Sequence, residues 1–176
     1  MSGDEPAELE LQSRREIYQH VAATPGIHFR ALLDAMGCAK GTLQYHLRWL
    51  EDEGLIEESD DGEYTRYYPA GDFDAEDRRV LNALRRTIAR RILAYLASEG
   101  ALTTSAIADR LEKSDSTISW HLSKLQEAGL VEKERDGRRV YYELTDPDRV
   151  QYLYTVYQGS FTDRLVDRLF DLWDAY

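Results

Sequence analysis

The feature that most constrains this chain is an internal repeat. The sequence TLQYHLRWL at residues 42–50 recurs as TISWHLSKL at residues 117–125. The same shift of 75 positions relates the two copies without a gap back to the pair Ile17 and Ile92. An ungapped repeat of this kind predicts two copies of one small structural unit. Function is then expected in what that unit presents to a partner.

Each copy has the pattern of three helices followed by a β-hairpin. In the second copy, Ile118, Leu122 and Leu125 recur at helical spacing in the third helix, which is expected to end at Gly129. An apolar pair, a charged stretch, an Asp-Gly turn and a tyrosine-rich segment follow, and this order is a strong hairpin signal. The first copy repeats it, with Leu43, Leu47 and Leu50 in its third helix.

Three helices and a hairpin, twice over, predict a mainly α fold with small β-hairpin wings, which is a tandem winged helix-turn-helix with a long C-terminal amphipathic helix. The expected parts are a disordered N-terminus (1–10), a first winged-helix domain (11–71), an Arg-rich linker helix (72–90), a second winged-helix domain (91–146) and a C-terminal dimerisation helix (147–176).

The segment SDSTISWHLSKLQEAGLV, residues 114–131, resembles the recognition-helix signature of the ArsR/MarR-type winged-helix transcriptional regulators. Two such units in one short chain are similar to predicted archaeal regulators with two helix-turn-helix domains. The resemblance covers about residues 15–68 and 90–145 and implies a DNA-binding regulator. The chain lacks the cysteine pair of the metal-sensing ArsR members, which removes metal sensing of that kind.

The 176 residues carry a formal net charge of −11 and a sequence pI near 4.8. Short acidic clusters such as 51–53 and 60–61 contribute much of this charge. We interpret the carboxylates as an adaptation to high intracellular salt, and an ordinary solvated surface is the alternative. Because acidity in general disfavours nucleic-acid binding, the local charge distribution matters more than the total.

Several classes of function lack support in the sequence. Cys38 is the single cysteine, so neither a disulfide framework nor a cysteine-rich metal site is expected. The four histidines show no metal-ligand spacing, and no cofactor is predicted. There is no glycine-rich phosphate loop and no nucleophile–base pattern, so the chain is not expected to be an enzyme. No apolar run approaches the roughly 20 residues of a membrane span, and the polar start is unlike a signal peptide, which predicts a cytoplasmic protein.

The second unit carries the stronger candidates for contact with double-stranded DNA. Polar residues of its third helix lie off the apolar stripe, where a recognition helix faces the major groove. Arginines around the turn at 136–137 form a basic wing tip suited to phosphates. Plain helix capping is the expected main role of Ser114, and pairing of the arginines with Glu132 and Glu134 is the alternative for the wing. The candidates are Lys113, Ser114, Ser116, Thr117, Ser119, Trp120, His121, Lys124, Arg135, Arg138 and Arg139.

The first unit is a weaker candidate because its wing tip is acidic. Either this copy binds DNA with its helix alone, or it has turned to packing, dimerisation or effector binding. His46 and His121 occupy matching places in the two copies. Histidines at such positions are more commonly half-buried structural residues than DNA contacts, which are the alternative. The first-unit candidates are Lys40, Thr42, Gln44, Tyr45, Arg48 and Arg66.

Two amphipathic segments lie outside the repeats. The linker is expected to run as helix without a break into the second unit. After Pro147, apolar and aromatic residues recur every three or four positions, with a kink expected near Gly159. A second copy of the chain is the simplest partner for this stripe. The predicted dimerisation residues are Leu153, Tyr157, Phe161, Leu165, Leu169 and Trp173.

The sequence therefore predicts a sequence-specific transcriptional regulator that acts as a homodimer, with the second unit as the principal DNA reader. The alternative is a winged-helix interaction scaffold without sequence-specific DNA contacts. The acidic first wing and the negative total charge favour that alternative. Target genes, operator, the sense of regulation and any small-molecule effector are not specified by the sequence.

Overall fold

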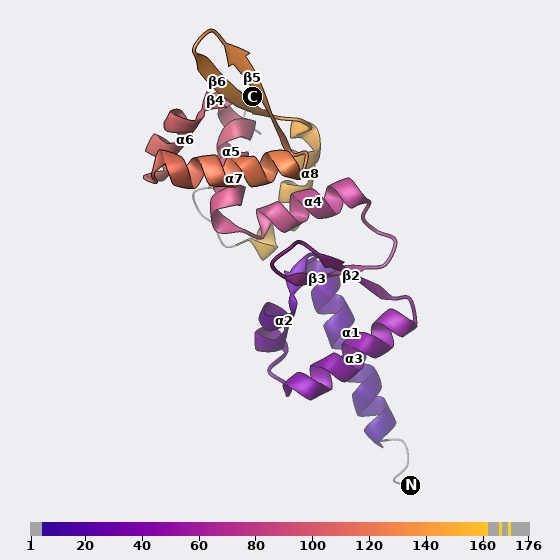
Figure 1. Cartoon of the computed structure of the whole chain (residues 1–176). Coiled ribbons are helices and arrows are strands. Elements are labelled where there is room, and N and C mark those ends of the chain that lie inside the picture. Colours follow the sequence, from indigo (N-terminus) through magenta and orange to yellow (C-terminus); the bar gives the residue numbers. More distant parts are fainter. Residues whose placement is uncertain (1–4, 162–165, 167–168, 170–176) are drawn as a thin grey trace. The chain divides into compact units, whose positions relative to one another are not determined.

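The computed structural model describes residues 5–161, 166 and 169 (Figure 1). The chain divides into two compact units, Met1–Arg78 and Arg79–Tyr176. Each unit contains one copy of the repeat and is described by itself below.

The first unit has three helices and a small antiparallel sheet. Its third strand is flanked by the other two, in the order β1-β3-β2. The elements are α1 (Glu5–Ala23), β1 (Ile27–His28), α2 (Phe29–Met36), α3 (Lys40–Asp52), β2 (Ile56–Asp60) and β3 (Thr65–Pro69), and α4 (Ala75–Leu84) begins at the end of this unit.

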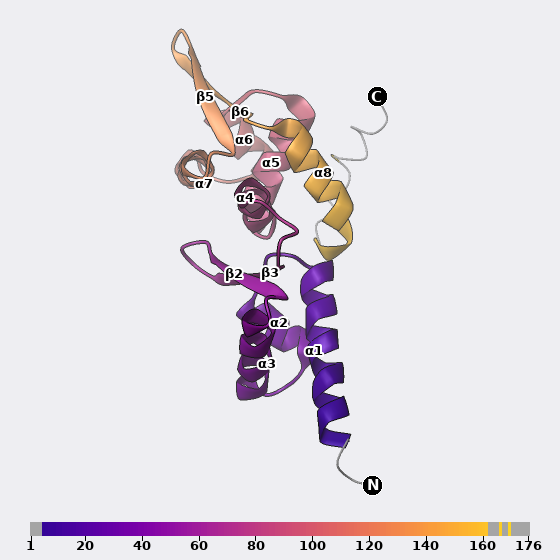
Figure 2. The same cartoon turned by 90° about the vertical axis from the view of Figure 1, so that its right-hand side faces the viewer.

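The second unit repeats this arrangement, with the strand order β4-β6-β5. Figure 2 shows its hairpin of β5 and β6 projecting away from the helices. The elements are α5 (Thr87–Glu99), β4 (Leu102–Thr103), α6 (Thr104–Leu111), α7 (Asp115–Glu127), β5 (Val131–Asp136), β6 (Arg139–Leu144), α8 (Pro147–Tyr157) and a 3₁₀ turn, η1 (Gln158–Ser160). The predicted tandem winged helix-turn-helix fold is confirmed, with an additional two-residue strand in each sheet.

The predicted apolar faces of the third helices form part of the two cores. In α3, Leu43, Leu47 and Leu50 are buried, and Ile17 and Val21 of α1 pack in the same cluster. In α7 the buried residues are Ile118, Leu122 and Leu125. Because these stripes face inward, the opposite faces of α3 and α7 are the ones left for a partner.

Side chains cap several of the helices, and the cap at Ser114 follows the sequence prediction. Thr103 accepts a hydrogen bond from the amide of Ala106 at 3.2 Å, and Ser114 accepts one from the amide of Thr117 at 3.2 Å. In the first unit, Nδ1 of His28 takes this role at the start of α2. Such caps satisfy amides that have no partner inside the helix.

Two predictions about the helices outside the repeats are wrong. Residues 5–10, expected to be disordered, form the first turns of α1. The linker helix is not continuous, because Arg86 adopts an extended conformation (φ −101°, ψ 121°) between α4 and α5. The guanidinium of buried Arg90 donates to the carbonyl of Leu84 at 2.7 Å and so satisfies an end of α4 that the break leaves open.

The predicted C-terminal helix is shorter than expected, and part of its apolar stripe is internal. The α-helix ends at Tyr157 and continues as η1. Leu153 and Phe161 are buried, and the Phe161 ring stacks on Tyr154 at 5.4 Å between centroids. Arg85 links the segment after α4 to η1, because its Nη1 donates to the carbonyl of Ser160 at 3.0 Å.

The assignment of Leu153 and Phe161 to a dimer interface is therefore corrected, because they are buried in the chain's own fold. Tyr157 and Leu169 are half-buried, and Leu165 and Trp173 lie outside the described residues. Among the helices of the described part of the chain, none combines the length and the apolar character needed to cross a bilayer.

Gly26 tests the packing of the first unit. It has φ +83°, and a Cβ built there would lie 2.9 Å from Oη of Tyr68, which is fully buried and cannot move aside. Gly71 has φ +80° with open space around it. We expect Gly26→Ala to lower the free energy of unfolding by about 2–4 kcal/mol, and Gly71→Ala by about 1–2 kcal/mol, as urea unfolding of the full chain would measure. Equal losses would contradict the close packing of Tyr68 on Gly26.

Candidate nucleic-acid interface

The outward face of α7 carries small polar residues. Ser116, Ser119 and Lys124 are exposed, as is Lys113 before the helix. Oγ of Ser114 lies 3.0 Å from Oγ of Ser116 and 2.8 Å from Oγ1 of Thr117. The N-terminal end of α7 therefore presents a cluster of hydroxyls beside backbone amides, which is a chemistry suited to phosphate or base edges.

Trp120 is the large side chain on this face, with 53% of its surface exposed. Its ring meets the ring of His121 edge to face, with 4.8 Å between centroids. Nζ of Lys124 lies 6.0 Å from the indole centroid and 3.1 Å from the carboxylate of Glu127. Burial lowers the pKa of His121, and the nearby Arg86 cation lowers it further. Both effects disfavour the charged form of His121, so His121 is a weak candidate for a phosphate contact.

The wing of the second unit presents unpaired cations. Arg135, Arg138 and Arg139 are exposed. None of the three has a hydrogen bond or ion pair from its side chain within residues 5–161, 166 and 169. The alternative in which Glu132 and Glu134 neutralise them is therefore wrong.

Lys133 is a further wing cation, which the sequence analysis missed. It is exposed and pairs across the hairpin with Tyr142, while Arg135 pairs with Val140. Because successive side chains of a strand alternate between faces, Lys133 and Arg135 share one face and Glu132 and Glu134 the other. That period of two was the signal in the sequence that could have found Lys133.

The corresponding helix in the first unit is partly covered by its own chain. The guanidinium of Arg14 lies 4.1 Å from the centroid of the Trp49 ring and 5.7 Å from that of Tyr45. Nη2 of Arg14 also donates to Oη of Tyr45 at 3.4 Å and pairs with Glu10. Lys40, Thr42, Gln44 and Arg48 remain exposed on α3. The second unit has Ala89 at the position of Arg14, so no arginine side chain covers its third helix in this way.

His46, the residue after Tyr45, is buried, with 4% of its surface exposed. Burial lowers its pKa, and the Arg14 cation acts in the same direction. Its Nδ1 has no hydrogen-bond partner in the described part of the chain. The structural alternative for His46 is thus the correct one.

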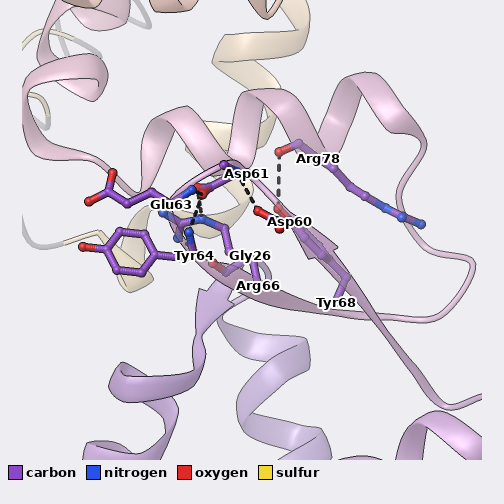
Figure 3. Close-up of polar contacts among 9 residues, drawn as sticks. Gly26, Asp60, Asp61, Glu63, Tyr64, Arg66, Tyr68 and Arg78 are labelled. Atoms are coloured by element: carbon purple, nitrogen blue, oxygen red, sulfur yellow. Dashed lines mark hydrogen bonds and ion pairs between the residues drawn. The ribbon is translucent and has the colours of Figure 1, made fainter.

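Arg66 was expected to contact DNA, and this prediction is wrong. Its side chain is buried, with 2% exposed. Nε donates to the carboxylate of Asp61 at 2.5 Å, and Nη1 donates to the carbonyl of Gly26 at 2.8 Å (Figure 3). A guanidinium held in this way is part of the protein interior and is not available to a phosphate.

Asp61 is the centre of the first wing tip. It accepts hydrogen bonds from the amides of Tyr64 at 2.8 Å and Glu63 at 3.0 Å, in addition to Arg66. Burial alone would raise the pKa of Asp61, but the hydrogen bonds from Arg66 and the two amides outweigh it and lower the pKa from 3.8 to about 2. The ring of His28 stacks on Tyr64 at 4.6 Å and closes the other side of the turn.

The two wings thus carry opposite charge at equivalent positions. Where the second wing has exposed cations, the first has carboxylates, and its one buried arginine is used internally. The pairs in repeat register are Lys133 and Glu58, Arg135 and Asp60, and Arg138 and Glu63. Within the described residues, no group of three or more His, Cys, Asp or Glu side chains is placed to hold a metal ion.

Two helix-turn-helix units, one with an exposed polar helix and a basic wing, define the class of winged helix-turn-helix proteins. Comparison with known families agrees, since residues 11–81 match a model described as an N-terminal HTH domain and residues 88–134 one described as a helix-turn-helix domain.

The uncharacterized HTH-type transcriptional regulator MJ1398 of Methanocaldococcus jannaschii is 34% identical over 81% of this chain and 36% of its own length. The arsenic resistance transcriptional regulator ArsR1 of Pseudomonas putida is 34% identical over 46% of this chain and 62% of its own length. The chain thus spans about a third of the first relative and less than two thirds of the second.

Among solved structures, a homodimeric winged helix-turn-helix domain from Mycobacterium bovis is 31% identical, with a TM-score of 0.42, and covers 52% of this chain and 89% of its own. The chain therefore carries two helix-turn-helix domains in tandem and resembles the ArsR-like winged-helix transcriptional regulators. Both of the curated relatives named above are described as transcriptional regulators.

Asp61→Asn tests the buried ion pair of the first wing. Because the pKa of Asp61 is about 2 in the folded chain against an ordinary 3.8, its contribution is fully present above about pH 4 and is lost as the pH falls to about 2. At pH 7 we expect the variant to lose about 2 kcal/mol of unfolding free energy, as urea titration would measure.

The difference between wild type and variant should shrink as the pH is lowered from 4 to 2. Asp136→Asn is the matched control, because Asp136 holds the same place in the second wing, is exposed and has no ion pair in the described residues. A loss for Asp136→Asn as large as that for Asp61→Asn would refute the special role of the first wing tip.

Proposed function

We propose that this chain is a sequence-specific DNA-binding transcriptional regulator whose second winged-helix unit is the principal reader. The observation that carries the proposal is the set of unpaired, exposed arginines on the second wing, beside an exposed polar face of α7. In winged-helix proteins of this kind the third helix enters the major groove, and wing cations bind phosphates next to it.

The electrostatics of the second unit support this use. The cations Lys133, Arg135, Arg138 and Arg139 lie on a chain whose total charge is −11, so the basic surface is local. Phosphate contacts weaken steeply with salt, so at high ionic strength short-range contacts from α7 carry more of the binding. The hydroxyls of Ser116 and Ser119 and the indole of Trp120 offer such contacts.

The first unit is assigned a supporting role. Its wing carries carboxylates, its one wing arginine is buried, and Arg14 covers part of the outer face of α3. These features favour packing, dimerisation or effector binding for this unit, which is the alternative to DNA contact through its helix. Lys40, Thr42, Gln44 and Arg48 would then make few contacts with DNA.

We propose further that the regulator is a homodimer that binds a pseudo-palindromic operator. With Leu153 and Phe161 buried, the apolar residues that α8 still exposes are Tyr152 (66% exposed) and Val156 (51% exposed). They stand four residues apart and so share one face of the helix. A two-fold axis would bring this face against itself in a second copy.

The double substitution Arg138→Ala and Arg139→Ala tests the wing. We expect affinity for a selected duplex to fall and the slope of log Kd against log salt concentration to decrease by about 2, since about two counterions fewer are released. Fluorescence anisotropy over a salt series would measure both quantities with the full chain.

The matched control is Lys40→Ala with Arg48→Ala, which removes the same charge from exposed positions of the first unit. Its slope should stay close to that of the wild type. An unchanged slope for the wing variant would remove the second wing from the mechanism, and binding without any preferred sequence would favour the scaffold.

Val156→Arg tests the dimer. A charge in an apolar two-fold contact is brought close to its own copy, so we expect the variant to be monomeric at concentrations where the wild type is dimeric, as sedimentation equilibrium would show. Thr155→Arg is the control, because Thr155 is exposed on the neighbouring face of α8. A monomeric wild type, or a dimer unaffected by Val156→Arg, would contradict the proposed interface.

A further inference from the structure

Trp120 stands out on the proposed reading face because it is the one large apolar side chain that α7 exposes. One helical turn before it lies Ser116, one residue before it Ser119, and three residues after it Ser123, and all three are exposed. Residues three and four positions apart lie side by side on a helix surface, so Ser116, Ser123 and Lys124 flank the indole. The indole therefore projects beyond the serines and would be the first group of this face to meet an opposing surface.

The indole also contacts the imidazole ring of the next residue. The ring of His121 meets it edge to face, with an interplanar angle of 86°. The ring nitrogen Nε1 of Trp120 makes no hydrogen bond with the described residues. An aromatic side chain has only two rotatable bonds and so loses little conformational entropy when it binds. α7 thus presents one exposed apolar group on a helix face that is otherwise polar.

We propose that Trp120 determines sequence specificity by packing against the C5-methyl group of a thymine in the major groove. This inference rests on the proposed DNA-binding function and adds the base that is read. Among the groups that base pairs present in the major groove, the thymine methyl is the apolar one, and the others are hydrogen-bond donors and acceptors. The serines can satisfy donors and acceptors around it, whereas an indole face cannot.

The first unit provides an internal comparison. Its equivalent residue is Tyr45, and the positions of Ser123 and Lys124 are taken there by the larger Arg48 and Trp49. Its hydroxyl accepts a hydrogen bond from Arg14, whose guanidinium also lies near the ring. Tyr45 is therefore engaged within its own unit, and the thymine contact is assigned to Trp120 alone.

The test uses the full chain and the duplex that is enriched most strongly from a random DNA library. Each thymine of that duplex is replaced in turn by deoxyuridine, which removes the methyl group and leaves base pairing unchanged. For the wild type we expect one position in each half-site to lose affinity about fourfold, the value of one buried methyl group. For Trp120→Ala the same replacement should have no effect, while its overall affinity is lower.

The loss should persist as salt is raised, because an apolar contact is little screened, whereas a phosphate contact would weaken. Tyr45→Ala is the matched control and should show the same deoxyuridine losses as the wild type. Circular dichroism of Trp120→Ala should be unchanged, since the side chain is exposed.

The outcomes separate the two proposals. Enrichment of a defined sequence with no deoxyuridine effect, or an effect that survives in Trp120→Ala, overturns the thymine contact and leaves the regulator function standing. Failure of the library to yield any preferred sequence overturns both.

Discussion

The structure depends on one buried stripe in the third helix of each unit. Ile118, Leu122 and Leu125 are at most 4% exposed, and each contributes about 1.5–3 kcal/mol by leaving water. Rotating α7 would expose this stripe, so the packing fixes which residues face outward. The hydroxyl cluster at Ser114 and the indole of Trp120 are presented to a partner because the opposite side of the same helix is held in the core. The same constraint in α3 turns Tyr45 outward.

The two copies of the repeat share this core and differ in whether the polar side chains at their surface have partners within the protein. In the first unit, Asp61 and Arg66 close the wing on itself, and Arg14 covers the aromatic residues of α3. In the second unit the wing arginines have no partner in the described residues. Ala89 stands at the position of Arg14, so the aromatic residue of α7 is not covered by an arginine. Side chains that already pair within the protein are not available to bind a nucleic acid. Unpaired arginines can bind phosphates, and this releases counterions from the DNA. This contrast underlies the assignment of the second unit as the reader.

Much of the fold could be predicted from the sequence, because the repeat and the apolar spacing are local patterns. The buried stripes and the cap at Ser114 followed from residue types at fixed positions. The errors concern side-chain contacts that apolar spacing does not encode. Arg66 binds the carbonyl of Gly26, 40 residues away, and Arg90 caps α4 across a break that no proline or glycine marks. The stripe of α8 was recognised, but periodicity states only that a face is buried and not whether its own chain or a second copy buries it. Lys133 was missed although strand alternation placed it beside Arg135.

The central claim is that DNA contacts the second unit through α7 and its wing. Amide hydrogen exchange of the full chain, with and without a selected duplex, tests it most directly, because protection is read along the whole backbone at once. The account predicts that the duplex slows exchange in the N-terminal half of α7 and in the hairpin of β5 and β6, while α3 and the hairpin of β2 and β3 exchange as before. Protection confined to α3 and the first hairpin, with α7 unchanged, would contradict it.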